Sequence, residues 1–245
     1  MVVSRIFPDV LEAPKPDRER LMVKRRLEVL ANIVHKQKLC SACSLMQETR
    51  ICSKLKDMKP ESPCSFRLAV HMHVKERFRS SNSGKLLEQL YDAPVFLDSD
   101  PDHMQNMADL VHENNGNCVV MFPTEDASDF NELKLQDNPL IFLIDGTWRQ
   151  ARRLNKNIPD SVPRVKIHPQ TISRFLCRTQ TQPDRVCTAE ATSMLLEDLG
   201  QPEEAARVLK GLEILQQAFN MQTFHKTERP PDRLKKQQRL NPIDS

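Results

Sequence analysis

Glycine is scarce in this sequence: only five of its 245 residues are glycine, and none of them forms a glycine-rich loop. The patterns G-x-x-x-x-G-K-[ST] and G-x-G-x-x-G, whose backbones cradle nucleotide phosphates, are both absent. The sequence therefore argues against a P-loop NTPase and against a Rossmann dinucleotide enzyme.

Long hydrophobic runs are also absent. No stretch approaches the roughly 18 uncharged residues that a membrane span needs, and the first twenty residues lack the continuous apolar segment of a secretory signal peptide. We therefore expect no membrane partner and a cytoplasmic location. In a reducing compartment, seven cysteines are read as metal ligands, core residues or reactive thiols before they are read as disulfides.

A strong excess of one charge is missing as well, because the formal net charge is only +3. Positive residues are nevertheless clustered in "KRR" at 24–26, "KERFR" at 75–79, "WRQARRLNK" at 148–156 and "RLKKQQR" at 233–239. Any one cluster alone is read more simply as a solvated helix face or tail. Several clusters around one candidate site favour contact with RNA or DNA, because phosphate contacts supply much of the affinity for nucleic acids.

What is present indicates one large domain with an appendage. An amphipathic helix is expected over 17–37, within an N-terminal extension that spans 1–38. An irregular cysteine-rich knuckle follows over 39–64. Strands alternate with helices over 65–225, which predicts an α/β domain with a mainly parallel sheet and helices on both faces. Proline-rich and basic residues predict a flexible tail over 226–245.

Individual elements follow from the same periodicities. Strands are expected at 66–72, 94–98, 118–123, 139–145 and 164–169, and helices at 83–91, 101–116, 147–158, 188–200 and 202–224.

Polar residues follow the apolar run "PLIFLI", where a parallel sheet gathers its ligands. Asp145 would end the strand, Gly146 would allow a tight turn, and Thr147 would be the N-cap of the next helix. The free N–H groups of that helix can receive a carboxylate or phosphate, and Trp148, the single tryptophan, can wall a pocket for a flat base. The alternative interpretation is that these residues are caps and core packing.

Two further segments, "FPTED" after the strand "CVVM" and "CTAEA" at the start of the penultimate helix, also carry polar residues at strand or helix ends. In "CTAEA", Thr188 is the expected N-cap and Glu190 an acid that the helix dipole favours in the first turn. The three segments together predict one pocket.

Cysteines near the N-terminus indicate a zinc site. Cys40 and Cys43 form a C-x-x-C pair, which can chelate one zinc ion from a single turn, and Cys52 and Cys64 can complete a tetrahedral set. His35 is an alternative fourth ligand. A redox-active C-x-x-C pair is the competing interpretation, but it usually opens a helix in a thioredoxin-like setting, which "KLCSACSLMQETR" does not resemble.

The other cysteines and two histidines favour structural interpretations. Cys118, Cys177 and Cys187 lie in or near apolar segments, so we expect them to be buried. His71 and His73 alternate along a strand end and can face a site, although a single histidine at a strand end is more often structural.

The run "LIDGTWRQARRL" resembles the D-x-T-W signature of the DTW-domain family, the tRNA-uridine aminocarboxypropyltransferases. Other pieces occur in the family's order: a C-x-x-C with a later cysteine, "SSNSGKL" like S-N-T-G-[RK]-L, "VVMFP", and "SRFLCRTQTQPDRVCTAEA" like R-x-x-R…C-T-x-E-A. The resemblance covers roughly 40–225 and is closest to the bacterial type.

This resemblance implies a fold and a reaction. The family is related to the SPOUT RNA methyltransferases, which implies S-adenosylmethionine held in a trefoil-knotted C-terminal region. Its members transfer the 3-amino-3-carboxypropyl group to N3 of a tRNA uridine and release methylthioadenosine. The competing hypotheses are a SPOUT-like RNA methyltransferase and a non-catalytic, zinc-dependent RNA-binding module.

The resemblance also assigns residues to roles. Asp145 is the candidate base, or else it holds the donor's ammonium or favours its sulfonium. The expected donor-binding residues are Asn82, Gly84, Pro123, Gly146, Thr147, Trp148, Thr188 and Glu190. The expected tRNA contacts are Arg79, Arg149, Arg174 and Arg178.

One departure from the family concerns the metal. Family members commonly carry C-x-C after the first cysteine pair, whereas Cys52 is followed by Ser53 and Lys54. Either Cys64 supplies the fourth ligand or the metal has been lost.

Overall fold

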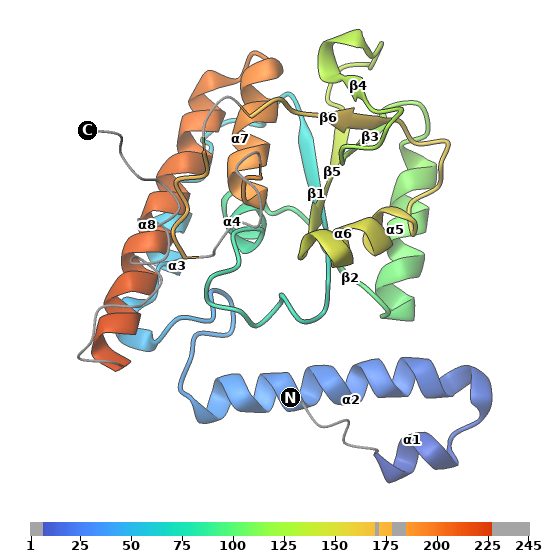
Figure 1. Cartoon of the computed structure of the whole chain (residues 1–245), viewed down its shortest axis with the longest axis vertical. Helices are drawn as coiled ribbons and strands as arrows, with labels where there is room; N and C mark the ends of the chain where they lie inside the picture. The colour runs from blue at the N-terminus through green and yellow to red at the C-terminus, as the bar shows by residue number, and fades with distance from the viewer. Residues whose placement is uncertain (1–6, 170–171, 178–184, 227–245) are drawn as a thin grey trace, which may run out of the picture.

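The structure is a computed structural model of the chain, and it describes residues 7–169, 172–177 and 185–226. These residues form a six-stranded sheet in which every pair of neighbours is parallel, in the order β2-β1-β5-β3-β6-β4 (Figure 1). The strands are β1 (Arg67–Met72), β2 (Val95–Leu97), β3 (Cys118–Met121), β4 (Ser128–Asp129), β5 (Leu140–Asp145) and β6 (Arg164–Lys166). The predicted α/β class and parallel sheet are confirmed.

Apolar residues cover both faces of the central strands, which explains why "LIFLI" lacks polar alternation. In β5, Ile141 and Leu143 belong to one core, and Leu140, Phe142 and Ile144 belong to the other. Successive side chains of a strand point to opposite faces, so one apolar run supplies two cores.

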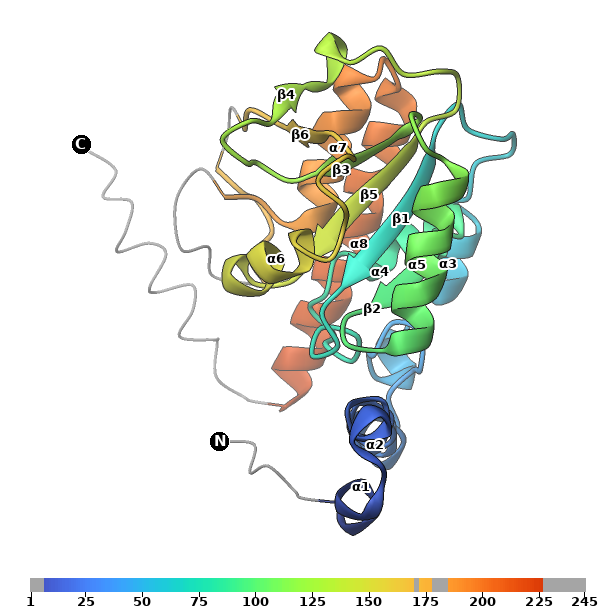
Figure 2. The same cartoon turned by 90° about the vertical axis from the view of Figure 1, so that its right-hand side faces the viewer.

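Helices close each core (Figure 2). One face of the sheet packs against α5 (Pro101–Glu113) and α6 (Trp148–Asn155). The other packs against α4 (Lys85–Tyr91), α7 (Thr188–Asp198) and α8 (Pro202–Lys226). Helices on both faces were expected from the sequence, and these two layers confirm them.

The N-terminal helices lie outside the two layers. α1 (Pro8–Glu12) folds back on α2 (Lys15–Lys36), and Figure 1 shows α2 running past the end of the sheet. Arg20 of α2 pairs with Asp102 at 2.6 Å. Since Asp102 lies in the first turn of α5, directly after β2, α2 contacts the carboxyl side of the sheet.

The structure contains short elements that were not expected from the sequence. The cysteine knuckle contains a 3₁₀ turn, η1 (Gln47–Thr49), and a short helix, α3 (Cys52–Lys56). The two-residue strand β4 and the 3₁₀ turn η2 (Phe130–Glu132) were missed, because such short elements have no periodicity to detect. The predicted tail over 226–245 lies outside the described residues except for Lys226, which ends α8, and part of the region in which a knot is expected lies outside them too, so both stay predictions.

Candidate functional site

A cavity of about 520 Å³ lies where three strands end. Register places these ends at one edge, since Met121 of β3 pairs with both Leu143 of β5 and Val165 of β6. The lining residues are Met121, Phe122, Pro123, Ile144, Gly146, Trp148, Ala151, Val165, Lys166, Ile167, His168, Pro169, Val186, Thr188 and Ala191. Their mixture of apolar walls with a few polar groups is typical of a small-molecule site.

Trp148 forms an aromatic wall of this cavity. Its ring packs at a tilt against Phe122, with centroids 6.3 Å apart. The guanidinium of Arg185 lies 4.6 Å from the centroid of the indole, a cation–π contact that joins the segment before α7 to the start of α6. The tryptophan is thus held between an aromatic ring and a cation.

Asp145 lies behind the cavity rather than on its wall. Its side chain is buried, with the residue 2% exposed. Oδ1 accepts a 2.6 Å hydrogen bond from the hydroxyl of Thr188, and Oδ2 accepts one from Nδ2 of Asn82. We call this three-residue arrangement the Asp145 clasp. It joins the end of β5 to the start of α7 and to the loop before α4.

Gly84 is needed beside the clasp because there is no room for a side chain. A Cβ at Gly84 would lie 2.8 Å from Cγ of Asp145 and 2.9 Å from its Oδ1. The neighbouring Asn82 accepts a 3.0 Å hydrogen bond from the backbone N–H of Lys85 through Oδ1. Asn82 therefore fixes the first turn of α4 with one atom and Asp145 with another.

Lys85 connects the clasp region to the cysteine knuckle. Its ammonium, in a residue 2% exposed, donates to the carbonyl oxygen of Cys43 at 3.0 Å and to Oγ of Ser44 at 2.9 Å. Burial lowers the pKa of Lys85 to about 8. The first residue of α4, Lys85, therefore contacts both the cysteine knuckle and, through Asn82, the clasp behind the cavity.

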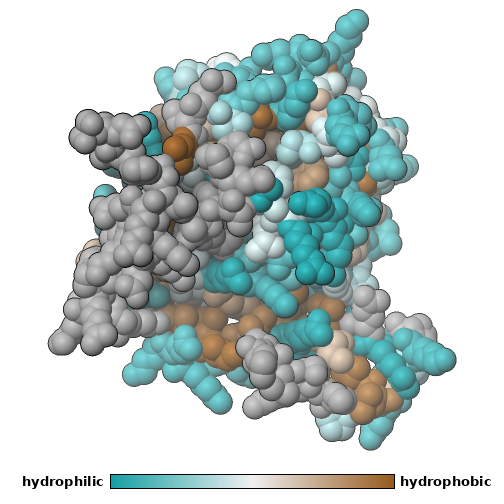
Figure 3. All heavy atoms as spheres, viewed as in Figure 1, coloured by the Kyte–Doolittle hydropathy of each residue, from teal (hydrophilic) through white to brown (hydrophobic). Residues whose placement is uncertain are grey.

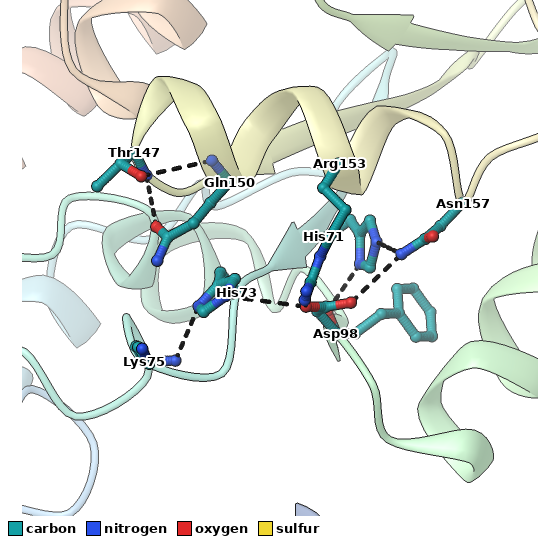
Figure 4. A network of polar contacts seen from close by, with 9 residues as sticks. His71, His73, Lys75, Asp98, Thr147, Gln150, Arg153 and Asn157 are labelled. Carbon is teal, nitrogen blue, oxygen red and sulfur yellow. Dashed lines mark hydrogen bonds and ion pairs between the residues drawn. The ribbon is translucent and has the colours of Figure 1, made fainter. Parts of the chain in front are cut away.

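The turn between β5 and α6 places Thr147 at the N-cap of α6, as the sequence predicts. Its Oγ1 accepts from the backbone N–H of Gln150 at 3.4 Å, and the Gln150 side chain accepts from the Thr147 N–H at 2.8 Å. This capping box, visible in Figure 4, confirms Thr147 as the N-cap of α6.

The start of α7 differs from its prediction. The N-cap is Cys187 and not Thr188, which is the first helical residue and turns its hydroxyl to Asp145. Glu190 does lie in the first turn, as expected. Its carboxylate accepts from the Ser173 hydroxyl at 2.6 Å and from the backbone N–H groups of Arg174 and Cys187 at 2.7 and 2.9 Å. These bonds anchor the 172–177 segment to α7.

The expected donor-binding residues therefore occupy four positions. Pro123, Gly146, Trp148 and Thr188 line the cavity. Asn82 and Gly84 lie behind it at the clasp, Thr147 is exposed at the helix start, and Glu190 is buried at the anchor. The apolar lining, among which are Phe122, Ile144 and Val186, was missed because such residues cannot be told from core residues in a sequence.

The arginines expected to contact tRNA are exposed where the structure describes them. These are Arg79, Arg149 and Arg174, and Arg178 lies outside the described residues. Arg79 pairs with Glu76 at 3.3 Å. The backbone N–H of Arg174 is used by the Glu190 anchor, which leaves its guanidinium at the surface.

Three cysteines of the knuckle converge. The thiols of Cys40, Cys43 and Cys52 all lie within 4.8 Å of one another. Burial opposes a thiolate at Cys40, but the backbone N–H groups of Cys43 and Ala42 and the Cys52 thiol together lower its pKa. The neighbouring Cys52 is shifted the other way, since burial raises the pKa of its thiol to about 12, so the fit to a zinc site rests on the three sulfurs that surround one point.

The fourth zinc ligand expected from the sequence, Cys64, does not lie with the other three cysteines. Cys64 does not belong to the group, and neither does the exposed His35, among the residues that the structure describes. Helix α3 and the prolines that follow it carry the chain to the start of β1, so Cys64 lines a second cavity of about 630 Å³. There the charge of Glu204 adds to burial and raises the pKa of the Cys64 thiol. As expected, Cys118, Cys177 and Cys187 are buried.

A buried polar network lies beside the cavity, at the ends of β1 and β2 (Figure 4). Asp98, 3% exposed, accepts from Arg153 and from Nδ2 of Asn157 at 3.4 Å, and its Oδ2 lies 3.9 Å from Nε2 of His73. His71 contacts the carbonyl of Phe96 through Nδ1 at 3.1 Å and the Asn157 amide through Nε2 at 3.2 Å. Both histidines hold structural positions, and burial lowers the pKa of each.

None of the described helices is long and apolar enough to cross a membrane. Comparison with solved structures gives no match.

A family model, the DTW domain, matches residues 37–221, which is more than half of the chain and leaves α1 and α2 outside. That span contains the three-cysteine group, the Asp145 clasp and every residue of the cavity. The chain therefore belongs to the DTW-domain family, the family of tRNA-uridine aminocarboxypropyltransferases.

Proposed function

We propose that this protein transfers the 3-amino-3-carboxypropyl group of S-adenosylmethionine to N3 of a uridine in tRNA and releases methylthioadenosine. The main support is the position of the family signature. Gly146 and Trp148 of "DGTW" and Thr188 of "CTAEA" line one cavity, although they lie far apart in the sequence. Three strand ends, an aromatic wall and a helix start surround a space of suitable size for a nucleoside-containing donor.

The reaction makes modest chemical demands. The bond from uridine N3 to the side-chain methylene forms while the bond from that carbon to sulfur breaks. The electron pair stays on sulfur, which changes from a sulfonium to a neutral thioether, and the N3 proton leaves to a base. Since the sulfonium is already a good leaving group, the enzyme mainly has to align the two reactants and remove one proton.

The cavity residues suit the parts of the donor. Trp148 and Phe122 offer aromatic surface for the adenine, and the apolar strand ends exclude water around it. The free N–H groups in the first turn of α6 can receive the donor carboxylate. A Cβ at Gly146 would lie 3.0 Å from Cβ of Gln150, so glycine leaves room there for the capping side chain.

The contacts of Asp145 favour a positioning role over proton removal. Both of its oxygens already accept hydrogen bonds, and it lies behind Thr188 rather than on the cavity wall. Each carboxylate oxygen keeps a second lone pair, so it is the position of Asp145 outside the cavity lining, more than its hydrogen bonds, that separates it from the N3 proton of a uridine. We propose that the clasp sets the position of Thr188 and the backbone of Gly146 around the donor.

We also propose that Cys40, Cys43 and Cys52 hold one structural zinc ion. Zinc would tie together the turn at Cys40–Ser44 and helix α3, which are otherwise short and irregular. Lys85 links that turn to the clasp, so the metal would support the cavity from outside the reaction.

The experiment that tests this function follows the fate of two labels. Purified protein is incubated with unmodified tRNA and with donor labelled either in its methyl group or in its aminocarboxypropyl chain. The proposed reaction labels tRNA only from the second donor and releases methylthioadenosine. Labelling from the methyl group, with release of S-adenosylhomocysteine, would instead select an RNA methyltransferase.

Donor binding can be followed independently of turnover. Trp148 is the only tryptophan in the chain and lines the cavity, so its fluorescence reports occupancy directly. A change on adding S-adenosylmethionine supports donor binding. An unchanged spectrum, no product and retained tRNA binding would together identify a non-catalytic RNA-binding module.

A further inference from the structure

Four cations share the exposed face of α6. Arg149, Arg152, Arg153 and Lys156, the C-cap, are all exposed. Their spacing of three, four and seven residues from the first places them on one side of a helix with 3.6 residues per turn. The opposite side buries Ala151 and Leu154 in the core of the sheet. We call these four positions the α6 cationic face.

This face begins at the cavity. Trp148, the first residue of α6, lines the cavity, and Arg149 follows it directly. In the view of Figure 1, strongly hydrophilic atoms gather over α6 (Figure 3). Ala151, on the opposite side of α6, also lines the cavity, so the cavity and the α6 cationic face flank the same helix, and an RNA strand that places a nucleotide in the cavity would pass beside this face.

Only one of the four cations is neutralised by an acid among the described residues. Arg153 pairs with the buried Asp98. Arg149, Arg152 and Lys156 have no acidic partner in the part of the chain that the structure describes. Several arginines elsewhere do have one, namely Arg20, Arg25, Arg77, Arg79 and Arg207. Other exposed cations of the described surface, such as Lys24, Arg26 and Arg50, also have no acidic partner, so what distinguishes α6 is that its unpaired cations lie together on one face of a helix that borders the cavity.

The helix itself does not explain the charges. Arg149 stands in the first turn, where the helix dipole disfavours a cation, and no acid in α6 compensates for it. Arg152 and Lys156 lie near the C-terminal end, where the dipole favours cations, but like charges three or four residues apart repel. A polyanion on this face would remove both costs.

We propose that the α6 cationic face binds the sugar-phosphate backbone of the RNA strand that presents the acceptor nucleotide. Arg149, Arg152 and Lys156 contact phosphates, and Arg153 does not. The three cations span about 10 Å along the helix axis, which suits successive phosphates of one strand. This inference rests on the proposed function, since it takes the cavity beside α6 as the place of reaction.

Arg153 acts as the anchor of the face. Its guanidinium is held by Asp98, which also accepts from Asn157 just after the end of the same helix. Figure 4 shows these side chains converging beneath α6. The buried carboxylate thereby fixes the roll of α6 about its axis, and that roll points the other three cations away from the sheet.

The test compares charge-removing variants of the full chain. Arg149→Gln, Arg152→Gln and Lys156→Gln are assayed for tRNA binding over a range of salt concentrations. Each should bind tRNA several-fold more weakly, and the slope of log affinity against log salt should fall by roughly one for each phosphate that is no longer neutralised. Because these side chains have no partner in the described fold, each variant should melt within about a degree of the wild type.

Two matched controls separate phosphate binding from general effects. Lys210→Gln removes an exposed cation from α8, where it pairs with Glu213, and should leave the salt slope unchanged. Arg153→Gln removes the ion pair with Asp98 and should lower the melting temperature, whereas its salt slope should fall by less than that of the triple variant, because all three phosphate-binding cations remain. If the triple variant of Arg149, Arg152 and Lys156 binds tRNA as the wild type does, the proposal is overturned, and a protein partner becomes the better occupant.

Failure of the two proposals would look different. If the α6 variants bind tRNA more weakly but the wild-type protein releases no methylthioadenosine, the phosphate-binding face is supported and the transferase is rejected. Product release with an unchanged tRNA affinity in every α6 variant would do the reverse.

Discussion

The hydroxyl of Thr188 donates a 2.6 Å hydrogen bond to Oδ1 of Asp145, across 43 residues of sequence. It joins the first residue of α7 to the last residue of β5, and the same carboxylate also holds Asn82. One wall of the cavity therefore depends on a single buried side chain that lies outside the cavity itself.

Asp145→Asn should fold, retain tRNA binding and transfer very slowly. The new amide cannot accept from both Asn82 and Thr188, so one buried donor is left without its partner, which costs about 1–3 kcal/mol of folding free energy. Urea unfolding and single-turnover transfer measure the two effects. Near-normal turnover would exclude both a base role and a positioning role for Asp145.

Gly84→Ala should impair the cavity by pushing on the clasp. The added Cβ would lie 2.8 Å from Cγ of Asp145, and overpacking of this kind costs about 1–3 kcal/mol. Donor affinity, measured by Trp148 fluorescence, should fall with stability. Gly211→Ala is the control: its Cβ would meet only the flexible ends of leucine side chains, the nearest being Leu90 Cδ1 at 3.2 Å, so donor affinity should not change.

Elemental analysis of protein prepared without added zinc should give about one zinc ion per chain. Cys40→Ser, Cys43→Ser and Cys52→Ser should each release the metal, and a chelator should lower the melting temperature of the wild type. Cys64→Ser should retain it, because Cys64 lies with Glu204 and away from the group. Metal loss in Cys64→Ser would contradict the three-cysteine site, as would metal-free wild-type protein.

The free energy of unfolding should fall at acidic pH, because two histidines of the Asp98 network are buried in their neutral form. Burial lowers the pKa of both His71 and His73, so below about pH 6.5 the unfolded chain binds protons that the folded chain does not. Each histidine then contributes a loss of up to about 1.4 kcal/mol per pH unit. A protonated His71 would also direct Nε2–H at the amide of Asn157, where it now accepts.

The measurement is the free energy of unfolding between pH 5 and 8. His71→Gln keeps one donor and one acceptor but cannot titrate, so its pH dependence should be flatter than that of the wild type. Equal slopes for the two proteins would show that His71 is not responsible.

Much of the fold was predictable because each long element carries its own pattern. Apolar runs such as "CVVM" and "LIFLI" are strands buried on both faces, and Pro101 marks the start of α5 as expected. The elements that were missed are short. Neither β4 nor α3 is long enough for a period to be seen, and both are held by contacts with distant strands or helices.

The site was predictable in its polar residues and not in its geometry. Gly146 and Trp148 could be assigned because a turn and a single tryptophan stand out in sequence. The direction of the Thr188 hydroxyl, and the separation of Cys64 from the other cysteines, depend on how distant segments meet. No local pattern carries that information.

The residues of the clasp are synthesised at different times, and Thr188 comes last. All six strands of the described sheet lie before residue 167, whereas the hydroxyl that completes the clasp belongs to residue 188. Synthesis from the N-terminus therefore completes the sheet before it completes the cavity. A chain that ended before Thr188 would contain all six strands and Asn82, but it would lack the Thr188 hydroxyl and also α7 and α8, which cover one face of the sheet. The cavity is therefore completed by a part of the chain that is synthesised after all six strands.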